Sequence, residues 1–234
     1  EFELYFQPKV DLLSLQVVGA EALIRWHRAG YGMVPPDVFI PLAEESGLIT
    51  KISQWVAKQA IEACKSWHNL GLQHITVAIN LSEVDFRRGN LPQKLLNYLS
   101  DAQLAPHYLE LELTESMIID DVSHVQRQIQ QLHAKGVSLA IDDFGTGYSN
   151  LGYLSKFNVS SLKIDQSFIK NLDESEHDYH IVKAIIQMGQ SLGIAIVAEG
   201  IENDVVAQKL KKLNCQFGQG YLWSKPLNND EFIA

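Results

Sequence analysis

Short apolar runs rich in β-branched residues alternate along the chain with longer amphipathic stretches. The short runs have the length and residue types of β-strands, whereas the longer stretches place apolar residues at approximately helical spacing. Strands are predicted at Leu4–Val10, Val17–Arg25, His74–Asn80, Tyr108–Leu113, Val137–Asp142, Ser160–Asp165, Ile194–Glu199 and, as a short one, near Gln216–Gly218. Helices are predicted at Pro36–Glu45, Ile49–Leu70, Pro92–Asp101, Asp121–Ala134, Asp178–Leu192 and Asp204–Leu213.

This alternation predicts an α/β protein with a mostly parallel sheet covered by helices. Eight strands favour a closed barrel over an open sheet, and 234 residues suit a (β/α)8 barrel. The first two strands are joined by a short turn around Asp11–Gln16, too short for a parallel crossover. We therefore expect a modified TIM-type (β/α)8 barrel with one antiparallel strand, the first strand being reversed. We find no linker or repeat and expect one domain over residues 1–234.

The composition is that of a globular domain with an acidic surface. The formal net charge is −9, and no basic groove or stripe is visible, which argues against binding to DNA or RNA polymers. Cys64 and Cys215 form no C-x-x-C pair, so a zinc ribbon or redox motif is disfavoured. We find no membrane-spanning run or signal peptide and expect a cytoplasmic domain. Because the chain starts at Glu1 without a methionine and the first strand follows at Leu4, we expect it to be excised from a longer multidomain signalling protein, which could be membrane-anchored.

Polar side chains follow the apolar part of successive strands, where the ends of barrel strands converge on one mouth. These side chains are Asn80, Glu112, Asp142, Asp143, Lys163, Glu199 and Gln219, with Glu21 and Arg25 near the second strand. Carboxylates that face one another repel unless they are paired or bind metal, and the only cations here are Arg25 and Lys163. Oxygen ligands without histidine or cysteine favour Mg²⁺ or Mn²⁺ over zinc.

The same positions carry an ordered set of motifs that spans nearly the whole chain. The motifs are Gln7-Pro8, Glu21-Ala22-Leu23-Ile24-Arg25-Trp26, Asn80-Leu81-Ser82, Glu112-Leu113-Thr114-Glu115-Ser116, Asp142-Asp143-Phe144-Gly145-Thr146-Gly147-Tyr148-Ser149, Leu162-Lys163-Ile164-Asp165, Ala198-Glu199-Gly200-Ile201-Glu202, Gln219-Gly220-Tyr221 and Lys225-Pro226. This set resembles the EAL-domain phosphodiesterases, which hydrolyse the bacterial second messenger cyclic di-GMP. No catalytic position of that family is replaced, and one departure, Asn150, stands where a second serine is common.

The resemblance implies a site for two ions, Mg²⁺ or Mn²⁺. The implied metal ligands are Glu21, Asn80, Glu112 and Asp142 for the first ion, with Asp142 bridging to a second ion on the side of Asp143 and Glu199. In such a site the ions hold and acidify the attacking water. The implied product is the linear dinucleotide 5'-pGpG.

The resemblance also implies roles around the metal ligands. The implied catalytic set is Glu199, Lys163, Glu21 and Asp142, in which Lys163 orients the water or neutralises charge and Glu199 is the general-base candidate. The implied substrate-binding set is Gln7, Leu23, Arg25, Asp143, Glu202 and Gln219, with Arg25 on a phosphate. Glu115 would stabilise the loop Asp143–Asn150. The family also suggests a homodimer and an upstream GGDEF or sensory domain.

Other interpretations remain beside the enzyme. A catalytically silent domain that binds cyclic di-GMP as a sensor is the main alternative, and a scaffold without a nucleotide site is a weaker one. Silent members usually lose a metal ligand, the lysine or the base, and all of these are present here. A Rossmann fingerprint at Gly145-Thr146-Gly147 is disfavoured, because its third glycine would fall at Asn150.

Overall fold

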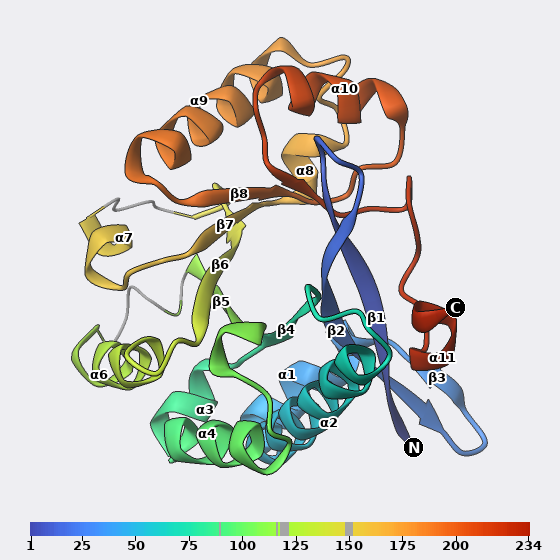
Figure 1. The fold of residues 1–234 in the computed structure, drawn as a ribbon, viewed down its shortest axis with the longest axis vertical. Coiled ribbons are helices and arrows are strands. Elements are labelled where there is room, and N and C mark those ends of the chain that lie inside the picture. The colour runs from blue at the N-terminus through green and yellow to red at the C-terminus, as the bar shows by residue number, and fades with distance from the viewer. Residues whose placement is uncertain (89, 116, 118–121, 148–151) are drawn as a thin grey trace.

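In the computed structural model, eight strands close into a barrel (Figure 1). The structure describes residues 1–88, 90–115, 117, 122–147 and 152–234. The barrel strands are β1 (Phe2–Asp11), β2 (Val17–Arg28), β4 (Thr76–Asn80), β5 (Leu109–Thr114), β6 (Ser138–Phe144), β7 (Ser161–Ile164), β8 (Ala195–Ala198) and β9 (Phe217–Gly218). They follow one another around the ring in this order, and β9 pairs with β1 to close it.

The strand directions confirm the expected fold class. β1 is antiparallel to both of its neighbours, β2 and β9. The other neighbouring barrel strands pair in parallel, from β2 with β4 to β8 with β9. The short turn after Asp11 explains the reversed strand: Asp11 Oδ1 accepts hydrogen bonds from the backbone N–H groups of Leu13 (3.0 Å) and Ser14 (2.7 Å). Such an Asx turn reverses the direction of the chain, so that β2 runs antiparallel beside β1.

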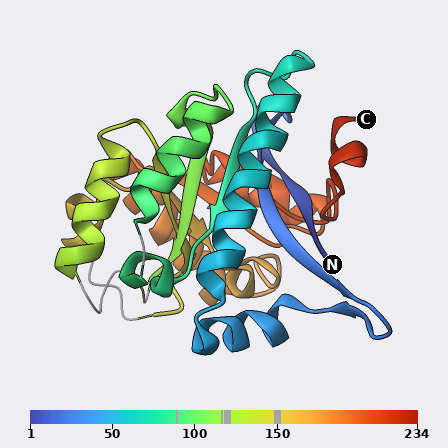
Figure 2. The same cartoon turned by 90° about the horizontal axis from the view of Figure 1, so that it is seen from below.

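All six predicted helices are present, and short elements accompany them. The longer helices are α1 (Pro36–Ser46), α2 (Ile49–Asn69), α4 (Leu91–Asp101), α6 (Val122–His133), α9 (Glu176–Leu192) and α10 (Asp204–Lys212). The short elements are β3 (Gly32–Val34), α3 (Glu83–Arg88), η1 (Pro106–Tyr108), α7 (Gly152–Lys156), α8 (Gln166–Ile169) and α11 (Asn229–Ile233). Figure 2 shows α2, α4 and α6 side by side along one flank of the barrel. Four residues named above, Ser116, Asp121, Tyr148 and Ser149, lie outside the described residues, as does Asn150.

The strands turn apolar side chains outward to the helices and polar ones into the barrel. In β5, Leu109, Leu111 and Leu113 are at most 2% exposed and belong to the hydrophobic core. Glu110 and Glu112 alternate with them and contact lysines of other barrel strands. Because successive side chains of a strand point to opposite faces, the core is the shell between strands and helices. Among the described residues, no helix is long and apolar enough to cross a membrane.

The outer shell is anchored by Trp67 of α2. Its side chain is fully buried, and its ring centroid lies 4.9 Å from Phe6 of β1 and 4.5 Å from Phe232 of α11. The indole N–H donates a hydrogen bond to Asn229 Oδ1 (3.0 Å). One residue therefore joins the reversed strand, the longest helix and the C-terminal helix.

Truncating Trp67 is expected to destabilise the whole barrel. Trp67→Ala should lower the free energy of unfolding by about 3–5 kcal/mol, because it leaves a cavity among rings that cannot collapse to fill it. Leu70→Ala, just beyond the same helix and 64% exposed, is the matched control and should change it by less than about 0.5 kcal/mol. Urea unfolding followed by circular dichroism measures both. Equal losses in the two variants would contradict this description of the core.

Candidate active site

The barrel strands gather the predicted polar residues at one mouth, each strand contributing at least one. They are Gln7 on β1, Glu21 on β2, Asn80 on β4, Glu112 on β5, Asp142 and Asp143 on β6, Lys163 on β7, Glu199 directly after β8 and Gln219 directly after β9. Strand register aligns them, because Gln7 pairs with Glu21 and Asn80 pairs with Glu112. Residues up to 212 positions apart therefore meet in one place.

The ammonium group of Lys163 lies at the centre of this mouth, and the residue is 2% exposed. Four carboxylates surround it. The distances from Lys163 Nζ are 2.7 Å to Glu112 Oε2, 2.8 Å to Glu199 Oε1, 3.2 Å to Glu21 Oε2 and 3.2 Å to Asp142 Oδ1. A cation with this many anionic neighbours is held in one position, since movement toward any of them weakens its contact with the others.

Amide side chains fix the orientation of the Glu21 carboxylate. Asn80 Nδ2 donates to Glu21 Oε1 (2.7 Å), and Gln219 Nε2 donates to Glu21 Oε2 (2.7 Å). Gln219 Nε2 also lies 3.2 Å from Gln7 Oε1. Burial opposes ionisation of Glu21, but Lys163 and the two amide donors together lower its pKa. Glu21 is therefore held as a carboxylate in a fixed direction.

Two other carboxyl groups beside Lys163, those of Glu199 and Glu112, lack enough positive charge to ionise easily. Burial raises the pKa of Glu199 to about 8, although the attraction of Lys163 offsets the effect of burial in part. Burial and the nearby charge of Glu21 raise the pKa of Glu112 well above its usual range. Burial alone would lower the pKa of Lys163, yet the carboxylates raise it well above its usual range. The cluster therefore holds protons until further positive charge arrives.

A break in the β6–β7 pairing brings two consecutive aspartates to the same site. The register shifts between Ile141 and Phe144, and Asp143 has a φ of +53°. In a regular strand Asp142 and Asp143 would point to opposite faces, and a bulge removes that restriction. Holding a non-glycine residue in this left-handed region costs about 1–2 kcal/mol.

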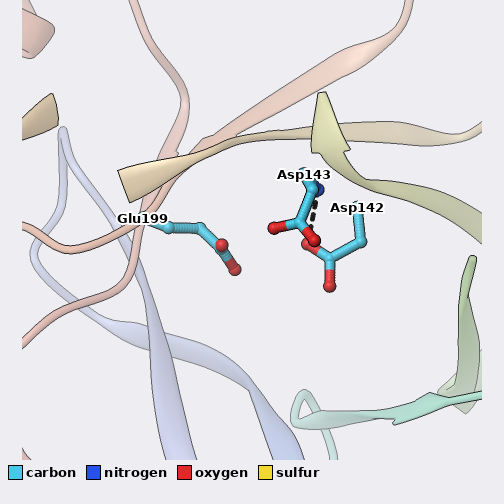
Figure 3. A group of neighbouring side chains, drawn as sticks. All are labelled: Asp142, Asp143 and Glu199. Atoms are coloured by element: carbon cyan, nitrogen blue, oxygen red, sulfur yellow. Dashed lines mark hydrogen bonds between the residues drawn. The ribbon is translucent and has the colours of Figure 1, made fainter. Parts of the chain in front are cut away.

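Asp142, Asp143 and Glu199 converge as a result. Their nearest carboxylate oxygens all lie within 4.8 Å of one another (Figure 3). The Asp143 N–H donates to Asp142 Oδ1 (3.0 Å), which orients the pair. Burial and the charge of Asp142 raise the pKa of Asp143 to about 6. Three oxygen donors at this spacing are the ligand type of hard divalent cations.

A cleft of about 350 Å³ opens above Lys163. Its lining includes eight predicted residues: Gln7, Glu21, Leu23, Asp142, Lys163, Glu199, Glu202 and Gln219. Gln166 and Lys170 also line it, and no sequence motif indicated either residue. Both belong to the short segment around α8, which has too few residues to show a periodic pattern.

Arg25 lies apart from this cleft. It lines a neighbouring cleft of about 520 Å³ together with Leu23 and Asn80, and Leu23 borders both clefts. The guanidinium group donates to the carbonyl of Ile24 (2.9 Å) and lies 5.7 Å from the centre of the Tyr5 ring. β2 continues to Arg28, so Arg25 lies within a strand and not at its end.

Glu115 contacts the described part of the loop after Asp143. It is 3% exposed, and its Oε2 accepts a hydrogen bond from the Gly145 N–H (3.4 Å). A Cβ atom at Gly147 would lie 3.3 Å from Glu115 Cδ, so the loop passes closely over this carboxyl group. The remaining residues of the predicted loop, 148–150, lie outside the described residues. These contacts are consistent with the loop-stabilising role, which stays a prediction.

Comparison with known proteins identifies the family. The model of the EAL domain matches residues 1–226. The bifunctional diguanylate cyclase/cyclic di-GMP phosphodiesterase MucR of Pseudomonas aeruginosa is 39% identical over 231 residues, which cover 99% of this chain and 34% of MucR. The chain thus spans about a third of the length of this relative.

Solved structures agree with the sequence match. The structure described as the PaMucR phosphodiesterase in complex with c-di-GMP has a TM-score of 0.95 at 38% identity, covering 99% of this chain and 94% of that one. BlrP1 of Klebsiella pneumoniae, in a calcium/cy-diGMP complex, has a TM-score of 0.84 at 28% identity, covering 97% of this chain and 56% of that one. The match over nearly the whole chain and the shared barrel show that this chain belongs to the EAL domain family.

Proposed function

We propose that this domain hydrolyses cyclic di-GMP to linear 5'-pGpG with water activated by two Mg²⁺ or Mn²⁺ ions. The observation that carries the proposal is the buried Lys163 within 3.2 Å of four carboxylates in an open cleft. Two similar structures, PaMucR and BlrP1, are described as complexes with the same nucleotide. Family membership supports the phosphodiesterase class, and the metal identity and the product are our inference.

The charge balance of the mouth fits two divalent cations. The cluster has one ammonium group, that of Lys163, and five carboxyl groups, those of Glu21, Glu112, Asp142, Asp143 and Glu199. Fully ionised, these groups carry a formal charge of −4, which two divalent cations would balance. Because the donors are oxygen atoms, they suit Mg²⁺ or Mn²⁺.

By their positions, the side chains would divide between the two ions. Glu21, Asn80, Glu112 and Asp142 would hold one ion, and Asp142, Asp143 and Glu199 the other. When bound, such ions acidify a water molecule and stabilise the charge that develops on the phosphate. Glu199 would accept a proton from the water, and Lys163, 2.8 Å from Glu199 Oε1, would neutralise negative charge beside it.

The substrate would occupy the cleft above the carboxylates. Gln7, Gln219 and Glu202 line it and offer hydrogen-bonding groups to the guanine and ribose parts of a nucleotide. Arg25, in the neighbouring cleft, would hold a second phosphate, and Leu23 would contact the nucleotide where the two clefts meet. A ligand with two nucleotides has the extent to use both clefts.

The wider context is also a proposal. The name of MucR combines a diguanylate cyclase with a cyclic di-GMP phosphodiesterase, and this chain covers about a third of MucR. We infer an upstream GGDEF or sensory domain in the full-length protein, and a homodimer through helices near the loop after Asp143. The cytoplasmic location expected from the sequence stays a prediction.

Turnover of cyclic di-GMP tests the proposed function. With Mg²⁺ or Mn²⁺ the protein should convert cyclic di-GMP to pGpG, as followed by chromatography. Glu21→Gln should lower the rate more than about 100-fold, because it removes a charge from the metal site and keeps its shape. Glu62→Gln on the exposed face of α2 is the matched control and should leave the rate unchanged.

The outcomes of this experiment separate the candidate functions. Binding of intact cyclic di-GMP without turnover would favour the silent sensor. Neither binding nor turnover would contradict both interpretations. Turnover without added metal, retained in the presence of a chelator, would contradict the metal-dependent mechanism.

The raised pKa of Glu199 predicts that metal binding depends on pH. Because Glu199 must lose a proton to bind a cation, the affinity for Mg²⁺ should rise as the pH increases from 6 to about 8, by up to about tenfold per unit. Isothermal titration calorimetry in buffers of different ionisation enthalpy should show proton release at pH 7. Glu199→Gln should weaken binding and release fewer protons.

Whereas the affinity for Mg²⁺ should rise with pH, the free energy of unfolding of the metal-free protein should fall. The pKa of Glu199 in the folded state, about 8, lies above the usual glutamate value of 4.5, so the folded state binds the proton more tightly than the unfolded state. The stability that comes from this proton is present at low pH and is lost as the pH rises toward 8. Urea unfolding at several pH values measures it, and a metal-free protein that grows more stable over this range would contradict the raised pKa.

A further inference from the structure

A second charged layer lies inside the barrel beneath the candidate active site. Lys9 Nζ of β1 contacts Glu110 Oε1 of β5 at 2.5 Å, and Ser161 Oγ of β7 donates to Glu110 Oε2 (3.1 Å). The side chains of Lys9 and Glu110 are each 12% exposed. This chain of contacts crosses the barrel interior from β1 to β7, and the function described above does not use it.

The barrel leaves room for the Lys9 side chain at Gly19. Lys9 pairs with Gly19 across β1 and β2. A Cβ atom at Gly19 would lie 3.2 Å from Lys9 Cε and 2.6 Å from Thr76 Oγ1. Because glycine has no side chain, the lysine can pass over β2 toward β5.

Each member of the lower layer lies two positions along its strand from a residue of the site, on the side away from the mouth. Glu110 precedes Glu112 by two positions on β5, and Ser161 precedes Lys163 by two positions on β7. Since side chains two positions apart in a strand share a face, the lower layer and the site face the same interior. On the reversed strand β1, Lys9 stands in the same relation to Gln7.

The two layers influence one another through their charges. Burial would raise the pKa of Glu110, but Lys9, the hydrogen bond from Ser161 and the charge of Lys163, in that order, lower it. The charge of Glu110 in turn contributes to the raised pKa of Glu112. Glu110 lies two positions below Glu112, which Lys163 contacts at 2.7 Å, and the cation that contacts Glu110 itself is Lys9, at 2.5 Å.

We propose that Lys9 is a positioning residue, which engages Glu110 and thereby keeps the Lys163 ammonium group among the four carboxylates of the mouth. The proposal rests on the proposed function for its activity readout. Without Lys9, the Glu110 carboxylate would draw Lys163 downward, away from Glu199 and Asp142. Without Glu110, the Lys9 ammonium group would turn to the carboxylates above and compete with Lys163. Removing both charges together should leave Lys163 where it is.

The test compares Lys9→Met, Glu110→Gln and the double variant, which remove the charges and keep the shapes. Each single variant should lower kcat for cyclic di-GMP by about 10–100-fold with little change in KM, as is typical when a residue that orients a metal site is lost. The double variant should return to within about threefold of the unmodified protein. Lys58→Met/Glu62→Gln, which removes an exposed Lys–Glu pair on α2, is the matched control and should have no effect.

The position of Lys163 is measured directly by nuclear magnetic resonance of its ¹⁵N-labelled side-chain amine, assigned by its loss in Lys163→Met. The signal should shift in each single variant and return in the double variant. If Lys9→Met fails to fold, the test rests on Glu110→Gln and the double variant. The Lys163 signal should then shift in Glu110→Gln and return to its original position in the double variant.

Three results would overturn the inference: unchanged activity in the single variants, losses that simply multiply in the double variant, or a Lys163 signal that does not move. If the unmodified protein shows no turnover, the proposed function fails, and the Lys163 signal alone then decides the positioning role.

Discussion

The arrangement of the mouth depends on one buried ammonium group, that of Lys163, placed among carboxylates that would otherwise repel one another. Its contacts of 2.7–3.2 Å reach four strands or strand ends of the barrel. A buried charge of this kind is tolerated when it is paired in good geometry, and it fixes the positions of its partners more than it stabilises the fold. The excess of carboxylate is what fits the mouth to bind divalent cations.

The barrel provides this arrangement because polar side chains face its interior and apolar side chains face the surrounding helices. Leucines of β5 face the helices, whereas Glu110 and Glu112 face the interior. The apolar shell, centred on residues such as Trp67, supplies the stability that a polar interior cannot supply. The left-handed backbone of Asp143 adds a local cost and lets a second aspartate lie beside Asp142 and Glu199. Strain of this kind is commonly found at functional sites.

Much of this arrangement could be predicted from the sequence, because strand ends in a barrel must converge. Alternating strands and helices predicted the barrel, the turn after Asp11 predicted the reversed strand, and polar residues such as Asn80 and Glu112 were expected at one mouth. The Lys9–Glu110 contact could not be predicted, since it joins residues 101 positions apart across the interior. Gln166 and Lys170 were missed because α8 is too short to show a pattern, and the left-handed Asp143 because local sequence does not specify a bulge.

The claim that the carboxylates around Lys163 form a two-metal site can be tested directly by anomalous diffraction from crystals of this domain grown with Mn²⁺. Two anomalous peaks are expected, one among Glu21, Asn80, Glu112 and Asp142, and one among Asp142, Asp143 and Glu199. Crystals of Glu21→Gln should lose the first peak. Ordered side chains in the same positions without any peak in the mouth, or peaks confined to other surfaces, would show that the carboxylates around Lys163 do not form a two-metal site.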